Sequence, residues 1–213
     1  MPRLDIKICG LSTAETLEAA LRHGATHIGF MHVRKSPRYL DLPALAGLAG
    51  RTPGHIGRVG VLVDPEDALV EALAATNALS TLQLHGKETP ERAAALARRT
   101  GLEVWKVISV KRAEDIASAA AYTGAVDRIL FDAKTPDNAA LEGGMGLRFD
   151  WSLLAGYRGS LPWGLAGGLD PDNVAAAVAQ TGAPLVDVSS GVESAPGVKD
   201  VDKIAAFCKA VTQ

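Results

Sequence analysis

The sequence contains little cysteine, only two in 213 residues. Two cysteines do not make a disulfide framework in a chain of this length, which is typical of a reducing compartment. No apolar run approaches the ~20 residues that a membrane span needs. Residues 1–10 pass almost directly into a strand-like run and leave no room for the apolar core of a signal peptide. These absences predict a soluble, cytoplasmic globular protein without a membrane partner.

Neither sign of charge dominates the chain. Charged residues make up 22% of it, the formal net charge is −2, and basic residues form no sustained stripe. We therefore expect no nucleic-acid partner. The histidines show no metal-ligand spacing such as His-Glu-x-x-His, so the sequence predicts no metal site.

What the chain does have is a regular alternation of two kinds of segment. Strand-like runs lie near 4–9, 26–31, 57–63, 80–84, 103–109, 126–131, 161–165 and 184–188. Helical patterns lie near 13–23, 42–50, 66–75, 90–100, 112–121, 150–155, 171–180 and 200–211. Eight repeats of strand then helix predict parallel pairing, because each crossover helix returns the chain to the same edge. With 47% hydrophobic residues and no linker-like segment, we predict one α/β domain over 1–213, a closed eight-stranded parallel (β/α)8 TIM barrel.

Two glycine-containing segments follow the last two predicted strands. Residues 164–173 read Gly-Leu-Ala-Gly-Gly-Leu-Asp-Pro-Asp-Asn, and residues 187–193 read Asp-Val-Ser-Ser-Gly-Val-Glu. Glycine lets the backbone approach a ligand closely, and a helix N-terminus offers free N–H donors to an anion. Either segment alone is typical of an ordinary strand-to-helix turn. Two of them on successive strand ends favour a phosphate site.

The active site of a barrel lies at the carboxyl ends of its strands, so polar side chains there are the candidates for chemistry. Alternation places Lys7 and Cys9 on the inward face of the first strand. A nearby lysine favours the thiolate, which makes Cys9 a usable base or nucleophile. Cys208 shares a helical face with apolar residues and is predicted to be a core residue. Asp132 closes the sixth strand with no helix directly after it, which favours a functional carboxylate acting as a general acid over a helix cap.

The fourth and eighth predicted strands also end in polar pairs. Gln83 and His85 share one face of the fourth strand, and Asp187 and Ser189 share one face of the eighth. A histidine in such a place is more often a hydrogen-bonded structural residue than a ligand. We therefore expect only a minor role for His85.

Two long connections follow the second and sixth predicted strands, over residues 33–41 and 133–148. Long βα loops are where barrels carry substrate clamps and lids, and the second of these contains glycines typical of a mobile loop. Arg38 lies in the first, after the stiffening residue Pro37. A surface arginine is usually solvated, but one at a barrel mouth opposite a phosphate site is a candidate clamp for a carboxylate.

In order along the chain stand the motifs Lys7-Ile8-Cys9-Gly10, Ser36-Pro37-Arg38, Gln83-Leu84-His85-Gly86, Phe131-Asp132-Ala133, Gly143-Gly144-x-Gly146-x-x-Phe149-Asp150-Trp151, Leu165-Ala166-Gly167-Gly168-Leu169, Asp187-Val188-Ser189-Ser190-Gly191-Val192-Glu193 and Pro196-Gly197-x-Lys199-Asp200. Each is weak alone, but the ordered set is specific and extends over residues 6–200. It resembles the phosphoribosylanthranilate isomerase family of tryptophan biosynthesis. One departure is the segment 31–35, which is more polar than the family's usual lead into Ser-Pro-Arg.

The resemblance implies a (β/α)8 barrel that catalyses an Amadori rearrangement of a small-molecule substrate, aldose amine to ketose amine, without cofactor or metal. It implies that Cys9 is the general base and Asp132 the general acid. Arg38 resembles the residue that binds the anthranilate carboxylate, and Asp187 lines the same side. The implied phosphate cradle consists of Gly167, Gly168, Ser189, Ser190 and Gly191. A monomer and a homodimer both stay open.

Two other interpretations stay open as well. One is a different phosphosugar barrel, such as an isomerase or an epimerase, although a metal-using epimerase would need paired histidines and aspartates that are not evident. The other is a non-catalytic barrel that binds a phosphorylated ligand. Such a protein need not keep Cys9 and Asp132 together, so their joint presence favours catalysis.

Overall fold

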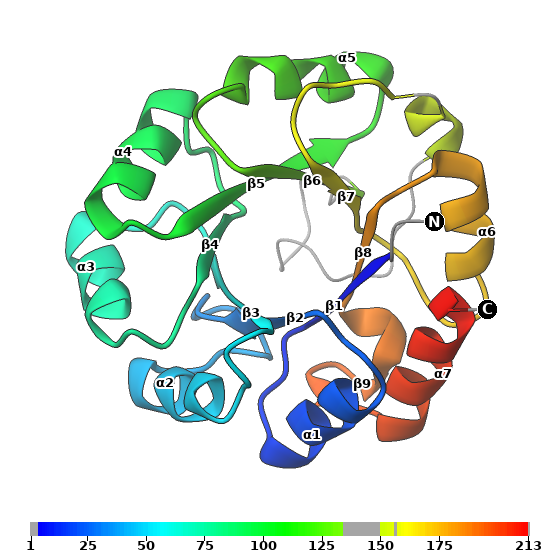
Figure 1. Ribbon diagram of the computed structural model, residues 1–213, viewed down its shortest axis with the longest axis horizontal. Helices are drawn as coiled ribbons and strands as arrows, with labels where there is room; N and C mark the ends of the chain where they lie inside the picture. Colours follow the sequence, from blue (N-terminus) through cyan, green and yellow to red (C-terminus); the bar gives the residue numbers. More distant parts are fainter. Residues whose placement is uncertain (1–3, 134–149, 156, 213) are drawn as a thin grey trace.

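Eight parallel strands form a closed barrel in the computed structural model, which describes residues 4–133, 150–155 and 157–212 (Figure 1). The strands are β1 (Asp5–Cys9), β2 (His27–Met31), β3 (Gly57–Leu62), β4 (Thr81–Leu84), β5 (Glu103–Val110), β6 (Arg128–Ala133), β7 (Trp163–Leu165) and β8 (Leu185–Val188). They pair in sequence order, and β8 closes the ring by pairing with β1. The predicted parallel (β/α)8 barrel is confirmed.

The helices surround the barrel on its outer side (Figure 1). They are α1 (Ala14–Arg22), α2 (Leu42–Gly50), α3 (Asp67–Ala75), α4 (Pro90–Thr100), α5 (Ala113–Ala117), α6 (Val174–Thr181) and α7 (Val201–Thr212). Side chains of Thr13, Asp41 and Thr89 accept hydrogen bonds from the first turns of α1, α2 and α4. These caps satisfy backbone donors that a helix start would otherwise leave unpaired.

Three helical predictions need correction. The segment 112–121 is the short α5 continued by the 3-10 helix η1 (Ser118–Tyr122), and 150–155 holds only the four-residue 3-10 helix η2 (Trp151–Leu154). The helix expected from residue 171 begins at Val174. Its start is delayed because Asn173 accepts from the Asp170 N–H at 3.1 Å and donates to the Gly168 carbonyl at 3.0 Å. These bonds hold residues 168–173 as a loop.

A small hairpin that the sequence did not predict follows β8. The 3-10 helix η3 (Ser190–Val192) leads into β9 (Glu193–Ala195), which pairs antiparallel with β10 (Val198–Lys199). At its turn, Gly197 has φ +82°, and an added Cβ would lie 2.7 Å from the Pro37 carbonyl oxygen. The hairpin therefore packs against the loop after β2.

Inside the barrel, an apolar layer lies beneath a charged layer that is nearer the carboxyl ends of the strands. An inward cluster of Val59, Trp105, Val107, Leu130 and Leu185 is buried separately from the larger core between strands and helices. On β8, Leu185 lies two residues before Asp187, so these side chains occupy successive inward layers. The apolar layer thus supports a charged layer nearer the strand carboxyl ends.

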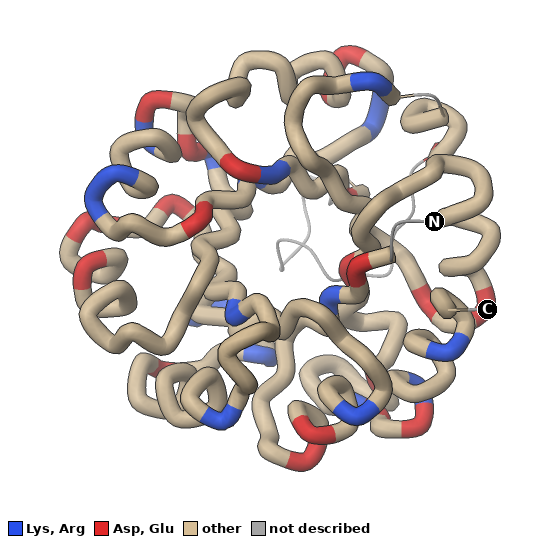
Figure 2. The backbone as a smooth tube through the Cα atoms, viewed as in Figure 1, with Lys and Arg blue, Asp and Glu red and all other residues tan. Residues whose placement is uncertain are grey.

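Positions of Lys or Arg and positions of Asp or Glu are interspersed along the outer helices in the backbone view of Figure 2. This mixture agrees with the formal net charge of −2. Within the part of the chain that the structure describes, no helix has the length and apolar character needed to cross a membrane.

Candidate active site

A buried ion pair joins the first and last strands of the barrel. Lys7 of β1 and Asp187 of β8 are register partners, and Lys7 Nζ donates to Asp187 Oδ2 at 2.8 Å. Burial lowers the pKa of Lys7, but the Asp187 carboxylate and the Cys9 sulfur raise it by more, so its net shift is upward. The ammonium group is therefore held charged inside the barrel, as the inward alternation of β1 predicted.

Cys9 lies on the same inward face, one layer above Lys7. A Cβ added to Gly29 of β2 would come 2.7 Å from Cys9 Sγ and 3.1 Å from Lys7 Nζ, so this glycine leaves room for both groups. Burial raises the pKa of the Cys9 thiol, while the ammonium groups of Lys7 and Lys199 lower it by less. The lysine effect expected from the sequence is present, but burial outweighs it.

Asp132 at the end of β6 contacts two neighbouring strand ends. Its Oδ2 lies 3.3 Å from Nε2 of His85, which follows β4. A Cβ added to Gly167 after β7 would lie 2.5 Å from Asp132 Oδ1 and 2.4 Å from the Ala133 nitrogen, and Gly167 has φ +86°. Only glycine allows this close approach and this backbone conformation. Gly167 therefore packs against Asp132 itself.

The two segments predicted to hold phosphate lie together. A Cβ added to Gly191 would come 1.9 Å from the Leu169 carbonyl oxygen, so the loop after β8 packs on the loop after β7. Gly168 adopts φ +66°, which bends the first loop at this place. Ser190 is partly exposed, whereas the Ser189 hydroxyl donates to the Cys9 carbonyl at 3.2 Å.

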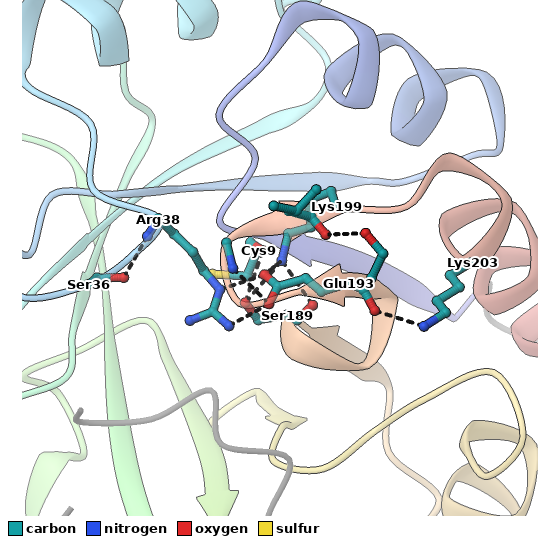
Figure 3. Close-up of polar contacts among 10 residues, drawn as sticks. Cys9, Ser36, Arg38, Ser189, Glu193, Lys199 and Lys203 are labelled. Carbon is teal, nitrogen blue, oxygen red and sulfur yellow. Dashed lines mark hydrogen bonds and ion pairs between the residues drawn. The ribbon is translucent and has the colours of Figure 1, made fainter. Parts of the chain in front are cut away.

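Arg38 is buried in the loop after β2, with only 5% of its surface exposed. Its guanidinium makes a two-pronged pair with Glu193 of β9, Nε to Oε1 at 2.6 Å and Nη2 to Oε2 at 2.7 Å (Figure 3). A Cβ added to Gly10 would lie 2.5 Å from Arg38 Cδ, so the loop after β1 makes room for the side chain. Arg38 is thus held between the loop after β1 and β9, and is not solvated at the surface.

Nearly the whole chain is similar to one protein family. The family model for N-(5'-phosphoribosyl)anthranilate (PRA) isomerase matches residues 6–210. The chain belongs to this family. The N-(5'-phosphoribosyl)anthranilate isomerase of Zymomonas mobilis subsp. pomaceae is 54% identical over 207 residues, 96% of each chain. The crystal structure of the Thermotoga maritima phosphoribosylanthranilate isomerase is 35% identical, with a TM-score of 0.87 over 98% of each chain.

A further solved phosphoribosylanthranilate isomerase was crystallised in complex with reduced 1-(o-carboxyphenylamino)-1-deoxyribulose 5-phosphate. It is 33% identical to this chain, with a TM-score of 0.85 over 98% of each chain. The family assigned from the ordered motifs is confirmed. The protein is accordingly an isomerase enzyme of tryptophan biosynthesis.

Two buried charges of this isomerase received no role from its sequence. Glu193 and Lys199 stand in the quoted motifs, but only the fold shows that Lys199 Nζ contacts Glu193 Oε1 at 2.7 Å. Burial lowers the pKa of Lys199 on balance, although Glu193 and Cys9 act in the opposite direction. The sequence did offer one signal for this contact. Glu193 and Lys199 stand on either side of Pro196-Gly197, a spacing that suits a hairpin.

A further buried ion pair ties the loop that carries His85 to β5. Lys106 Nζ of β5 donates to Glu88 Oε2 at 2.9 Å and to the Gly86 carbonyl at 2.7 Å. Glu88 Oε1 accepts from the Asp64 N–H at 2.8 Å, and the Tyr122 hydroxyl donates to the Glu88 carbonyl at 2.8 Å. The loop after β4 is therefore fixed by charges that alternation alone did not single out.

Among the described residues, no group of three or more His, Cys, Asp and Glu side chains could hold a metal ion. Cys208 is 1% exposed within the helix-facing core, which confirms its predicted place there. The glycine loop predicted over residues 133–148 lies outside the described residues from 134 onward.

Proposed function

We propose that this isomerase converts N-(5-phosphoribosyl)anthranilate to 1-(2-carboxyphenylamino)-1-deoxyribulose 5-phosphate by general acid/base catalysis. The observation that carries the proposal is the placement of Cys9 and Asp132 at the carboxyl ends of β1 and β6. Around the eight-stranded ring, β8 and β7 separate these strands, so the two groups approach the mouth from nearly opposite sides. A sugar bound between them can receive a proton on one side and lose one on the other.

In the first step the Asp132 carboxyl group donates a proton to the ribose ring oxygen. The bond from this oxygen to C1 breaks, and the anthranilate nitrogen supplies its electron pair to form a protonated Schiff base. The His85 contact to Oδ2 at 3.3 Å orients the carboxyl group for this transfer. In this scheme His85 positions the acid and does not touch the reacting atoms.

In the second step the Cys9 thiolate removes the proton from C2. The electrons of that C–H bond form a C1–C2 double bond, and the Schiff base nitrogen recovers its pair as an enolamine. C1 then receives a proton and the C2 hydroxyl gives up its own, which leaves the ketone at C2. Because Lys7 and Lys199 both lower the pKa of Cys9, their ammonium groups favour the thiolate that this step needs.

The same geometry supports a direction for the substrate. We place its phosphate at the joined loops after β7 and β8, formed by Gly167, Gly168, Ser189, Ser190 and Gly191, and its carboxylate toward Arg38. The Ser189 hydroxyl already bonds to the Cys9 carbonyl, so the backbone of Ser189 is its proposed contribution. Asp187 lines the anthranilate side, and its ion pair with Lys7 sets the charge of the layer below the sugar.

The decisive experiment follows the loss of substrate fluorescence as the purified protein consumes phosphoribosylanthranilate. Cys9→Ala and Asp132→Asn should each lower kcat by about 10²–10⁴-fold, the usual contribution of a proton-transfer group. Both variants should still bind the reduced product analogue, because they leave the phosphate loops intact. Cys208→Ala is the matched control and should keep normal turnover.

Near-normal turnover by Cys9→Ala or Asp132→Asn would remove that residue from the mechanism. A wild-type protein that binds the analogue but consumes no substrate would overturn the proposed reaction and favour a non-catalytic phosphate-binding barrel.

A further inference from the structure

Glu193 lies at the centre of a row of charges beside the proposed site (Figure 3). On one side it binds the Arg38 guanidinium, and on the other it contacts the Lys199 ammonium. The side chains of the acid and of both bases are each at most 5% exposed. A buried pair of this kind is stable only when its geometry is good and its remaining polar atoms are satisfied.

Both carboxylate oxygens of Glu193 accept hydrogen bonds from two donors. Oε1 accepts from Arg38 Nε at 2.6 Å and from Lys199 Nζ at 2.7 Å. Oε2 accepts from Arg38 Nη2 at 2.7 Å and from the Gly197 N–H at 3.2 Å. All four of these contacts are with donors. A glutamine amide in place of the carboxylate would therefore bring its NH₂ group against N–H donors that it cannot accept from.

The row is tied to the strand ends that carry the proposed chemistry. Lys199 Nζ also donates to the Ser189 carbonyl at 2.9 Å, and the Ser189 hydroxyl donates to the Cys9 carbonyl at 3.2 Å. On the other side, the close contact of Gly10 with Arg38 fixes the stem of the arginine. Glu193 is thus the link between the guanidinium and the ends of β1 and β8.

We propose that Glu193 is a positioning residue for the isomerase reaction, which fixes the plane of the Arg38 guanidinium toward the substrate carboxylate while Lys199 holds Glu193 in place. The inference rests on the proposed role of Arg38. An arginine side chain is long and flexible, and fixing it before the substrate arrives removes an ordering cost from binding.

The charges of the row suit this role. Two cations and one anion leave one positive charge facing a substrate that carries a carboxylate and a phosphate. Burial raises the pKa of Glu193, but Arg38 and Lys199 lower it by more, so that the carboxyl group is ionised at neutral pH. Glu193 therefore orients Arg38 without cancelling the attraction for an anion.

The test is the isosteric variant Glu193→Gln, assayed for KM and kcat with phosphoribosylanthranilate. Whichever way the amide turns, its NH₂ group faces two donors, so the guanidinium loses its fixed plane. Loss of a hydrogen bond to a charged group typically weakens binding by about tenfold or more. We therefore expect KM to rise by about that factor. We expect kcat to change much less, because Cys9 and Asp132 are unaltered.

A double-mutant cycle separates positioning from a general effect on folding. In an Arg38→Met background, adding Glu193→Gln should raise KM little further, because the residue that it positions is gone. Leu73→Ala, which truncates a buried side chain in the helix-facing core, should lower stability without changing KM. Glu18→Gln, on the exposed face of α1, is the matched Glu-to-Gln control and should alter neither quantity.

If Glu193→Gln does not fold, Lys199→Met provides the second measurement, with a smaller rise in KM expected. An unchanged KM in the folded variant, or an effect of Glu193→Gln that persists in full without Arg38, would overturn the inference. An inactive wild-type protein would instead be a failure of the proposed function, since the inference concerns only how an active enzyme binds its substrate.

Discussion

Among single residues, Cys9 is the proposed base, and opposing electrostatic effects act on its thiol. It is 5% exposed, and this burial raises the pKa of its thiol. The charged Lys7 and Lys199 act in the other direction but do not outweigh burial. In the free enzyme only a small fraction of Cys9 is thiolate at neutral pH. The proposed base therefore depends strongly on each ammonium group that remains near it.

Replacing Lys7 should lower activity through this thiolate fraction. In Lys7→Gln the pKa of Cys9 should rise further, and each unit of rise reduces the thiolate at neutral pH by about tenfold. We expect kcat/KM at pH 7 to fall by about tenfold or more, and the wild-type kcat/KM to increase from pH 7 toward pH 9. Steady-state or stopped-flow measurements of kcat/KM between pH 7 and pH 9 test both expectations. A wild-type profile that is flat up to pH 9 would contradict thiolate catalysis by Cys9.

The inward residues of the site could be predicted because alternation in a strand fixes them locally. Lys7, Cys9 and Asp187 all follow from the period of two along β1 and β8. The pair between Arg38 and Glu193 joins residues 155 positions apart, and no local pattern encodes it. The steric need for glycine at position 167 could not be predicted either, since the atoms that crowd it belong to Asp132 and Ala133 of β6.

For whole elements, a local capping side chain helps to predict where a helix begins. Thr13, Asp41 and Thr89 cap their helices through side chains that are adjacent in sequence. The delayed start of α6 comes from the local bonds of Asn173 to Asp170 and Gly168, which the helix-start pattern of Asp170-Pro171 does not reveal. The β9–β10 hairpin depends on tertiary bonds instead. In the hairpin, Glu193 bonds to Arg38 from a distant loop, and strands of two or three residues have too little pattern to recognise.

The loop after β4 should be the element most sensitive to loss of a buried charge. Lys106→Met would leave the Glu88 carboxylate, now 2% exposed, without its cation. Breaking a buried pair by removing one partner costs about 3–5 kcal/mol, so we expect that loss in the free energy of unfolding in urea. Lys111→Met, at an exposed position just after β5, should change it by less than about 0.5 kcal/mol. A cost for Lys106→Met as small as that of Lys111→Met would mean that the pair does not fix the loop.

In the molecule as a whole, the closed barrel has the proposed site at the carboxyl ends of its strands and supporting contacts at their amino ends. At the amino end, the His27 ring lies 5.2 Å from the Trp105 ring, over which the Arg128 guanidinium sits at 5.0 Å. A Cβ added to Gly57 would come 2.2 Å from His27 Cδ2, so this glycine makes room for the imidazole. The ring is therefore enclosed by residues of β3 and β5, and His27 is the register partner of Lys7, one layer below Cys9.

This enclosure should make the stability of the whole barrel depend on pH. Burial lowers the pKa of His27 to about 4, with Arg128 and Lys7 adding to the decrease and Asp5 opposing it. In the unfolded chain the histidine pKa is about 6.5, so between pH 4 and pH 6.5 the unfolded state binds more protons than the folded state. The stability that neutral His27 contributes is therefore complete above pH 6.5 and is lost as pH falls toward 4. Between pH 7 and pH 5 the loss should be about 2 kcal/mol in urea unfolding. His27→Gln should remove this part of the pH dependence, whereas His55→Gln, at an exposed position, should keep it. If both variants keep the wild-type slope, the proton that opposes folding binds elsewhere, and the amino end of the barrel tolerates a charged imidazole.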